Sequence, residues 1–546
     1  MSKLISRAAF LRGALALGAL GLAGKSIYER QSLLRQIPCR VLGPSRGLGH
    51  KLRDGVALLP GESKDSLQKK VLIIGAGIAG LSAAWWLKRN GFSDFVLIEL
   101  EKHAGGNAAS GRNEISAYPW GAHYVPLANE ESKYVRLLFE ELGIISSYDQ
   151  QSLPLYNELY LCHEPQEKLF KDGSFQEGLV PKRGLQPKEK DELSRFFALV
   201  AELRSKIGKD SRPAFAIPLD QSSQDEEYLQ LDRISMAEWL KENRFSTRPL
   251  LWYVNYCCRD DYGSSIDNVS AWAALHYFAG RRGKAGNAEM NSVVTWPEGN
   301  GFLVESLRKY SEEQIMTATL AARIIADGDR LETLCLKDAG GKELCIKSSA
   351  LIFSAPRFLA QYLIQDHEKH NNADSKSLVY APWLVANVSL RQVPSCRSEL
   401  FAWDNVDYYS DSLGYVMATH QNISTRTGAT VLTYYYPMSA EEPMLARRKL
   451  LNLDEKLWSE KIIADLERLN PGIRSDILSI DFWPWGHGMI RPSVGYIWGE
   501  NRRKMKENSG QIFFAHSDMS GISNFEEAQY HGVEAAKAVL AKFGQS

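Results

Sequence analysis

The chain has 546 residues, 44% of them hydrophobic, and is long enough to bury more than one core. Its 65 lysine and arginine residues balance 65 aspartate and glutamate residues, so no basic field favours nucleic acid or an anionic membrane as a partner. Its seven cysteines are too few and too irregularly spaced for a disulfide framework or a zinc site, and we expect no metal.

The first 26 residues have the features of a signal peptide. Basic residues precede an apolar run over residues 14–23, which is too short to span a bilayer stably. The stretch "SRAAFLRG" resembles a twin-arginine export signal in which Ala8 replaces the second arginine. We therefore expect a periplasmic or otherwise exported enzyme, with an uncleaved N-terminal membrane anchor as the alternative. Residues 27–68 are expected to form an irregular leader, to which no function is assigned.

A dinucleotide-binding unit follows the leader. Residues 71–74 are apolar and predict a strand, after which Gly75, Gly77 and Gly80 have the G-x-G-x-x-G spacing of a turn that approaches a pyrophosphate. A helix begins at this turn and directs its N-terminal amides toward the anion. A second strand over residues 95–98 ends at Glu99, at the distance of about 20 residues where a carboxylate binds a ribose.

Two further segments favour FAD over NAD. "LEKHAGGNAASG", from Leu100 onward, resembles the E-x5-G-G extension of the flavin amine oxidoreductase superfamily, and "QIFFAHSDMSGISNFEEAQYHGVEAAKAVL" resembles that superfamily's closing flavin motif. Residues 318–356 also resemble its β-hairpin returning to the nucleotide domain. The resemblance implies that FAD is the cofactor and that Asp518 contacts its ribityl chain. No cysteine lies beyond residue 396, so FAD is expected to be held non-covalently.

The resemblance and the glycine motif together name the residues expected at the cofactor. They are Gly75, Gly77, Ile78, Ala79, Gly80, Glu99, Leu100, Gly105, Gly106, Asn107, Gly121, Ala122, Ile324 and Asp518.

The fold implied is α/β, with a Rossmann-type FAD-binding domain of the glutathione-reductase-like kind and an interleaved α+β substrate domain. A capping box at Ser235 and Glu238 predicts the start of a helix in the substrate domain. The FAD-binding domain is expected to comprise residues 69–150, 287–365 and 480–546, and the substrate domain residues 151–286 and 366–479.

Short motifs resemble the spermidine dehydrogenase-like branch of the superfamily. They are "APWLVANVSL" around Asn387 and "WPWGHGMIRP" from Trp483 to Pro492. Many amine oxidases have a lysine on the strand that the first motif resembles. This chain has Asn387 and no lysine there, which favours a dehydrogenase over a lysine-assisted oxidase.

Four residues are the candidates for catalysis. His123 and Tyr124 follow the small residues Gly121 and Ala122, where backbone can approach the flavin ring. Trp485 and His487 are expected on the opposite side of the site. Each histidine is a candidate proton acceptor, substrate-orienting group or structural residue.

Two further groups of residues are candidates for the substrate site. Asp260 and Asp261 either bind a cationic substrate or are solvated. Tyr434, Tyr435 and Tyr436 could complete the wall of the site, although an alternating strand points only some of them inward.

Three functions fit these motifs. The first is an FAD-dependent oxidoreductase that takes a hydride from an amine-type substrate, including polyamines, onto flavin N5. The second is a flavin-dependent desaturase or oxidase of an isoprenoid or tetrapyrrole. The third is a non-catalytic flavin-binding protein. Oxygen, a quinone and a protein carrier all remain open as electron acceptors.

Overall fold

The computed structural model describes residues 37–53, 65–328, 330–338, 342–367, 375–394, 401–422 and 428–544. The predicted signal peptide and residues 27–36 and 54–64 of the predicted leader lie outside this part. Within the described residues, no helix is both long and apolar enough to cross a membrane.

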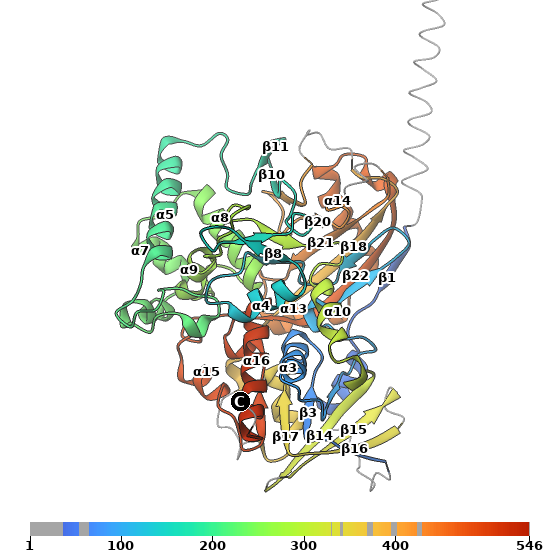
Figure 1. Ribbon diagram of the computed structural model, residues 1–546. Coiled ribbons are helices and arrows are strands. Elements are labelled where there is room, and N and C mark those ends of the chain that lie inside the picture. The colour runs from blue at the N-terminus through green and yellow to red at the C-terminus, as the bar shows by residue number, and fades with distance from the viewer. Residues whose placement is uncertain are drawn as a thin grey trace, which may run out of the picture.

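A five-stranded parallel sheet forms the centre of the nucleotide-binding half (Figure 1). Each strand of the sheet is short, and β3 and β4 are buried along their whole length because both faces are covered. The strands in order across the sheet are β13 (Ile315–Met316), β4 (Phe95–Ile98), β3 (Val71–Ile74), β17 (Ala350–Phe353) and β23 (Ile512–Phe514).

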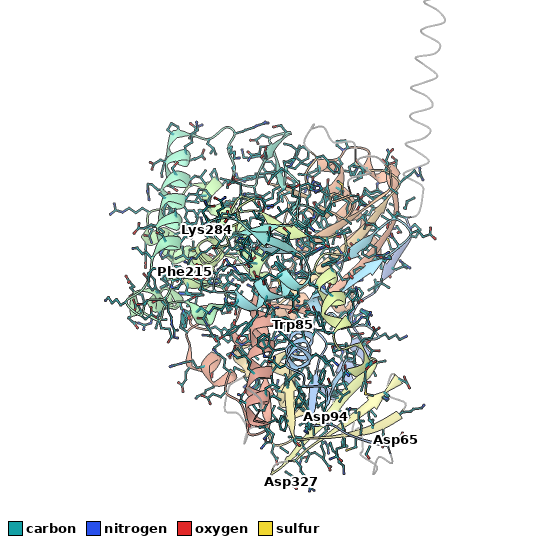
Figure 2. All side chains as sticks on the ribbon, viewed as in Figure 1. Asp65, Trp85, Asp94, Phe215, Lys284 and Asp327 are labelled. Carbon is teal, nitrogen blue, oxygen red and sulfur yellow. The ribbon has the colours of Figure 1, made fainter. Side chains whose placement is uncertain are left out.

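Two helices, α3 (Ile78–Arg89) and α16 (Phe525–Lys542), pack together on one face of this sheet. They approach closely at Gly532, where a Cβ atom would lie 2.1 Å from the carbonyl oxygen of Ala79. Trp85 of α3 is completely buried here and donates its indole N–H to Glu141 over 2.9 Å (Figure 2). The start of α3 is therefore fixed firmly at the ends of the strands.

An antiparallel sheet covers the other face, as the predicted hairpin requires. It consists of β14 (Thr319–Asp327), β15 (Arg330–Lys337) and β16 (Lys342–Ser348), with β2 (Ser66–Gln68) added parallel to β16. Its outer end lies at the edge of the molecule, where Asp65 and Asp327 are exposed (Figure 2).

The substrate half is built on an eight-stranded mixed sheet. One face packs on α13 (Pro443–Leu451) and α14 (Glu455–Leu469), and the other faces a layer of helices. The strands in order are β1 (Cys39–Val41), β22 (Ile477–Ile490), β18 (Tyr380–Leu390), β21 (Thr430–Pro437), β20 (Tyr415–Met417), β19 (Asp404–Asp407), β10 (Glu167–Lys171) and β11 (Ser174–Glu177).

The helical layer lies on the opposite side of the substrate half from α14 (Figure 1). Its helices are α5 (Pro187–Ser205), α6 (Glu226–Leu229), α7 (Met236–Glu242), α8 (Arg248–Tyr262) and α9 (Ala271–Ala279). The predicted capping box is confirmed: the Ser235 hydroxyl accepts from the Glu238 amide over 3.2 Å, and the Glu238 carboxylate accepts from the Ser235 amide over 2.8 Å.

Shorter elements complete the structure, and α4 and α10 pack in the same core as α3 and α16. The helices are α4 (Lys133–Glu141), α10 (Gly301–Lys309), α11 (Ala360–Leu363) and α15 (Glu500–Met505). The strands are β5 (Ser110–Arg112), β6 (Ala117–Pro119), β7 (Tyr124–Pro126), β8 (Ile145–Tyr148), β9 (Pro154–Tyr156) and β12 (Val293–Thr295).

The predicted leader is not irregular throughout, and this part of the prediction is wrong. Cys39–Val41 form β1, which pairs in parallel with β22, and Arg46–Arg53 form helix α2. Pairing with a strand more than 400 residues away in sequence stabilises three residues that carry no local strand pattern. The expected boundary at residue 480 also falls inside β22, so this strand is shared between the predicted domains.

Candidate active site

A deep cavity lies at the carboxyl ends of β3, β4 and β17, the edge at which parallel sheets bind nucleotides. Eleven of the predicted cofactor residues line it. They are Gly75, Gly77, Ile78, Ala79, Glu99, Leu100, Gly105, Gly106, Asn107, Ala122 and Asp518.

The glycines of the turn have different tasks. Gly75 has φ +99°, which favours glycine, and Gly77 has open space within 4 Å of the position of a Cβ atom. A side chain at Gly77 would therefore enter the cavity, where the fingerprint places a pyrophosphate. At Gly80, by contrast, a Cβ would lie 1.9 Å from the carbonyl oxygen of Gly75. Gly80 therefore lets the helix pack on the strand.

Glu99 is held at the rim of the cavity by backbone amides. Its Oε2 accepts from the Ala76 N–H over 2.7 Å, and its Oε1 accepts from the Glu101 N–H over 2.9 Å. Burial raises the pKa of Glu99, an effect that these hydrogen bonds oppose. Each oxygen retains a lone pair that can accept from a ribose hydroxyl.

Asp518 has an unsatisfied oxygen, which is a direct sign of a missing partner. Its Oδ2 accepts from the Arg357 N–H over 2.8 Å and from the Tyr380 hydroxyl over 2.5 Å, whereas its Oδ1 is buried without a hydrogen bond. An orphaned buried acceptor is costly unless a ligand supplies a donor. A ribityl hydroxyl is such a donor, so the residues present fit FAD.

Three predicted cofactor residues do not line the cavity. Gly80 packs against the strand, Gly121 lines the neighbouring pocket, and Ile324 is completely buried in the core between the two sheets. A register shift in β14 between Ala321 and Arg323 separates Ile324 from the cavity wall, which Ala321 reaches instead. The prediction for Ile324 is therefore wrong.

A second pocket opens directly from the cofactor cavity. The boundary between them is formed by residues that line both: Asn107, Ala122, Asn300, Gly488, Ser523, Asn524 and Phe525. A molecule in the second pocket would therefore lie beside a cofactor in the first.

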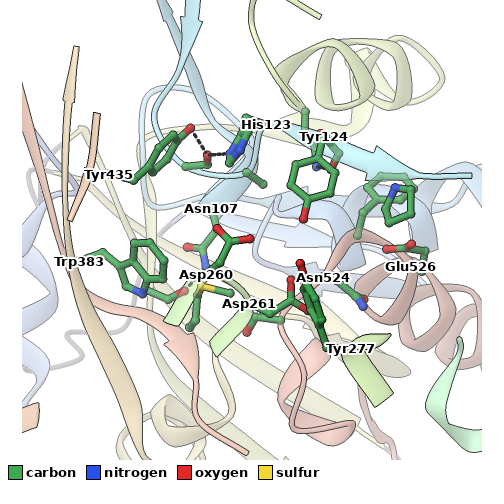
Figure 3. Close-up of a pocket in the computed structure, with 18 of the residues that line it drawn as sticks. Asn107, His123, Tyr124, Asp260, Asp261, Tyr277, Trp383, Tyr435, Asn524 and Glu526 are labelled. Atoms are coloured by element: carbon green, nitrogen blue, oxygen red, sulfur yellow. Dashed lines mark hydrogen bonds between the residues drawn. The ribbon is translucent and has the colours of Figure 1, made fainter. Parts of the chain in front are cut away.

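Aromatic side chains form much of the second pocket (Figure 3). Of the three consecutive tyrosines, only Tyr435 lines it, as the alternation of the strand predicted. Tyr434 points away and donates to Asp465 over 2.6 Å, and Tyr436 packs on Trp458. The aromatic residues that line the pocket are Tyr124, Tyr277, Trp383, Tyr435, Trp485 and Phe525.

His123 lies against Tyr435, with 4.6 Å between the ring centroids. Its Nδ1 is 3.3 Å from the carbonyl oxygen of Gly121, which also accepts from the Tyr435 hydroxyl over 2.9 Å (Figure 3). Burial lowers the pKa of His123 to about 4. The imidazole is therefore neutral near pH 7, with its proton on Nδ1 and its Nε2 left as an acceptor.

The two adjacent aspartates both face the pocket but differ in their partners (Figure 3). Asp261 pairs with Arg281 over 2.7 Å, and Arg281 also donates to the Tyr124 hydroxyl over 3.1 Å. Asp260 has no hydrogen bond or ion pair with any described residue. Burial, and then the charge of Asp261, raise the pKa of Asp260 to about 7.

Further carboxyl groups surround Asp260. Glu526 lines the pocket with a buried Oε2 that lacks a hydrogen bond, and burial raises its pKa to about 7. Glu167 and Asp404 are direct partners in the parallel pairing of β10 and β19. Burial and then the charge of Glu167 raise the pKa of Asp404, and Asp260 contributes a further increase. Among the described residues that line the pocket, three acids, Asp260, Asp261 and Glu526, stand against one arginine, Arg281.

The four predicted catalytic residues do not all line the same cavity. His123, Tyr124 and Trp485 line the second pocket, and the Trp485 indole donates to the Trp120 carbonyl over 2.6 Å. His487 instead lines the cofactor cavity and stacks on Phe358 at 4.6 Å. In β22, residues 486–488 oppose the single residue Pro382, and this bulge turns His487 away from the face of Trp485. The expected position of His487 on the substrate wall is therefore wrong.

Asn387 lines neither cavity. Its amide donates to the Pro119 carbonyl over 3.1 Å and its oxygen accepts from the Thr433 hydroxyl over 2.7 Å, so it is a structural residue. The strand that carries it presents Trp383 and Val385 to the pocket, and the described lining residues include no lysine.

Sequence reasoning missed Arg281 and Glu526. Arg281 follows α9 in "AGRR", and Glu526 stands in the closing motif, one residue after the start of α16. A signal was present for Glu526, since the first turn of a helix that faces a cofactor also faces whatever binds beside it. No local pattern marked Arg281.

Comparison with known proteins agrees with this geometry. A family model described as an NAD(P)-binding Rossmann-like domain matches residues 73–142. The oxidoreductase PigB of Serratia sp. (strain ATCC 39006) is 24% identical over 295 residues, which are 51% of this chain and 42% of PigB. The chain therefore matches less than half the length of this curated relative.

Solved amine oxidases share the architecture of most of the chain. Wild-type putrescine oxidase bound to putrescine matches with a TM-score of 0.65 and 14% identity, covering 87% of this chain and 100% of that chain. Cyclohexylamine oxidase from Brevibacterium oxydans IH-35A matches with a TM-score of 0.61 and 14% identity, covering 87% and 99%. The chain therefore has the fold of these amine oxidases, in agreement with the α/β fold that its sequence motifs implied.

Proposed function

We propose that the protein is an FAD-dependent oxidoreductase that removes a hydride from the carbon beside an amine nitrogen, and that its substrate is a polyamine. The observation that carries this proposal is the unpaired carboxyl group of Asp260 in an aromatic pocket that opens into the cofactor cavity. Bound FAD supplies the hydride acceptor, and the residues of the chain must supply everything else.

The pocket has the chemistry to bind an ammonium group. Aromatic faces attract cations, and Tyr124, Tyr277 and Tyr435 lie around the acids. Asp261 is already neutralised by Arg281, so Asp260 and Glu526 remain to pair with the substrate. A purely apolar substrate, such as an isoprenoid, would bury these carboxyl groups without partners, and this disfavours the desaturase alternative.

The same groups can prepare the amine for reaction. A hydride leaves only when the nitrogen lone pair is free, so the ammonium group must first lose a proton. Asp260, with a pKa of about 7, is suited to accept that proton near neutral pH. The Nε2 acceptor of neutral His123 can then take a hydrogen bond from the amine and orient it.

A second positive charge on the substrate would explain the acids behind the pocket. Glu167 and Asp404 lie side by side on neighbouring strands, and the pKa shifts of Asp260 and Asp404 reflect the charge of Glu167. Like charges brought together in this way favour a ligand with more than one positive charge. A polyamine satisfies both the reacting site and this cluster.

Anaerobic reduction of the purified enzyme tests the proposal. A series of diamines and polyamines should bleach the flavin absorbance, whereas alcohols of the same length should leave it unchanged. Asp260→Asn should weaken amine binding about tenfold to a hundredfold, the range for a charged hydrogen bond. Bleaching by an isoprenoid or a tetrapyrrole and by no amine would refute the amine assignment. Absence of bound FAD would refute the function altogether.

Export is part of the proposal on sequence grounds alone. Residues 1–26, fused to a reporter that folds before export, should carry it across the cytoplasmic membrane if the twin-arginine resemblance is functional. Export of unfolded passengers only would indicate a different route.

A further inference from the structure

Residues 37–53 run from the substrate half to the cofactor cavity, although they precede the whole dinucleotide-binding unit in sequence. At one end, β1 forms the edge of the eight-stranded sheet beside β22. At the other end, Gly49 and Leu52 of α2 are part of the wall of the cofactor cavity. Leu52 also packs against the core between the two nucleotide-binding sheets.

Two polar contacts fix this segment, which we call the strap. The Arg40 guanidinium binds the Asp481 carboxylate through both oxygens, over 2.7 and 2.6 Å. The Asp481 side chain is only 3% exposed, so this is a contact between an outer arginine and a buried acid. Near the cavity, the Ser45 N–H and hydroxyl donate to the two oxygens of Glu101, over 2.7 and 2.8 Å.

The contact between Ser45 and Glu101 is connected to the predicted ribose site by a hydrogen bond. Glu101 receives the strap through its side chain, and its backbone N–H donates to Glu99 Oε1 over 2.9 Å. The acid that holds the strap and the acid expected to hold the ribose are therefore joined by one hydrogen bond. The position of the strap is therefore linked to the end of the second strand, where the ribose is expected to bind.

The charge of α2 also suits a position over the cofactor. The helix sequence RGLGHKLR contains arginine, histidine and lysine and no acid. Among the described residues that line the cavity there is neither lysine nor arginine. A dinucleotide pyrophosphate carries two negative charges, so a basic helix beside its cavity adds an attraction that the wall itself lacks.

We propose that residues 37–53 are a cofactor-retaining strap, which closes over bound FAD and slows its release. This inference rests on the proposed FAD site, but it is independent of the proposed amine substrate. It assigns a task to a segment that lies outside the dinucleotide fold. If the proposed export holds, the strap would also help to keep a non-covalently bound cofactor on an enzyme that leaves the compartment where FAD is made.

Glu101→Ala is the informative variant, because it removes both hydrogen bonds from Ser45 and keeps the backbone N–H that donates to Glu99. After dilution of the FAD-loaded enzyme, the rise of free-flavin fluorescence should be roughly ten to a hundred times faster than in the wild type, as expected for loss of two hydrogen bonds to a charge. Ser45→Ala should have a smaller effect, since the Ser45 N–H still binds Glu101.

Arg233→Ala is the matched control, because it breaks an exposed 2.7 Å pair with Glu226 in the helical layer. Its flavin release should equal that of the wild type. Limited trypsin digestion gives a second measurement: Arg46 and Arg53 should be cut faster in Glu101→Ala than in either the wild type or Arg233→Ala, with FAD bound in all three.

The possible failures are distinguishable. If Glu101→Ala binds FAD but releases it at the wild-type rate, the strap does not retain the cofactor, and the proposed function is unaffected. If the wild-type protein binds no FAD, the proposed function itself is wrong. Faster cleavage without faster release would show that the strap opens but does not limit dissociation, and this also overturns the inference.

Discussion

The side-chain amide of Asn107 donates a hydrogen bond to the backbone carbonyl of Gly488, and this contact lies where the cofactor cavity meets the substrate pocket. Asn107 follows the Gly105–Gly106 pair of the nucleotide unit, whereas Gly488 belongs to the bulge of β22 in the other half. One hydrogen bond thus ties together the two walls between which a reacting carbon and the flavin would meet.

Asn107→Asp should disturb this junction without emptying the cofactor site. The carboxylate cannot donate to the Gly488 carbonyl, and it places two acceptors face to face. We expect FAD content to stay near that of the wild type and the anaerobic rate of flavin reduction to fall about tenfold or more, since loss of a positioned contact at the reacting centre is costly. Asn90→Asp, at the exposed end of α3, is the control and should reduce at the wild-type rate. An unchanged rate in Asn107→Asp would mean that the junction tolerates movement.

Gly77→Val and Gly80→Val should fail in different ways. The Gly77 side chain would enter the cofactor cavity, so we expect a folded apoprotein with a nearly unchanged melting temperature when compared with FAD-free wild type. The Gly80 side chain would meet the Gly75 carbonyl, so the apoprotein itself should lose stability by about 1 to 3 kcal/mol or more. Flavin absorbance per protein and thermal unfolding of both apoproteins measure the difference. Equal melting temperatures would contradict the division of tasks between the two glycines.

Local sequence was sufficient to identify the cofactor half. The strand, turn and helix around Gly75, Gly77 and Gly80 are fixed by contacts within about 30 residues, so their pattern predicts their structure. Glu99 could be named because it directly follows a short strand, whereas Asp518, which lies in the turn after β23, was named from the resemblance of the closing motif. For the three tyrosines, alternation along a strand left two choices, Tyr435 alone or Tyr434 together with Tyr436, and the structure has Tyr435 in the pocket.

The rest of the site depends on contacts that no local pattern encodes. Glu167 and Asp404 become neighbours only through the pairing of β10 and β19, which lie far apart in sequence. His487 was misplaced because a bulge changes the face of a strand, and the glycines on both sides of it were the available warning. The strap was missed because β1 has three residues and is held by its partner strand.

His487→Ala and His123→Ala should have different effects, because His487 lines the cofactor cavity and His123 lines the substrate pocket. His487 lines the cofactor cavity and stacks on Phe358, so its removal should change the flavin absorption spectrum and weaken FAD retention about tenfold. His123 faces the substrate pocket, so its removal should leave the spectrum and FAD content unchanged and slow flavin reduction by an amine. Absorption spectra, flavin release and stopped-flow reduction of both variants measure this. A spectral change in His123→Ala alone would reverse the assignment.

The affinity for a cation should fall as the pH falls through the pKa of Asp260. That pKa is raised to about 7 by burial and by the neighbouring Asp261, so the carboxyl group is charged above pH 7 and increasingly protonated below it. A quaternary ammonium ligand is the suitable probe, because it carries a permanent charge and cannot react. Its dissociation constant should be nearly constant above pH 7 and should increase toward tenfold per pH unit below it. In Asp260→Asn the binding should be weaker and the pH dependence of the dissociation constant should be reduced.

Glu526→Gln is the matched comparison, since burial also raises the pKa of Glu526 to about 7. If the dependence persists in Asp260→Asn and disappears in Glu526→Gln, Glu526 is the carboxylate that binds the ammonium group. If binding to the wild type does not change between pH 5 and 9, neither carboxylate pairs with the ligand, and the cationic substrate loses its main support.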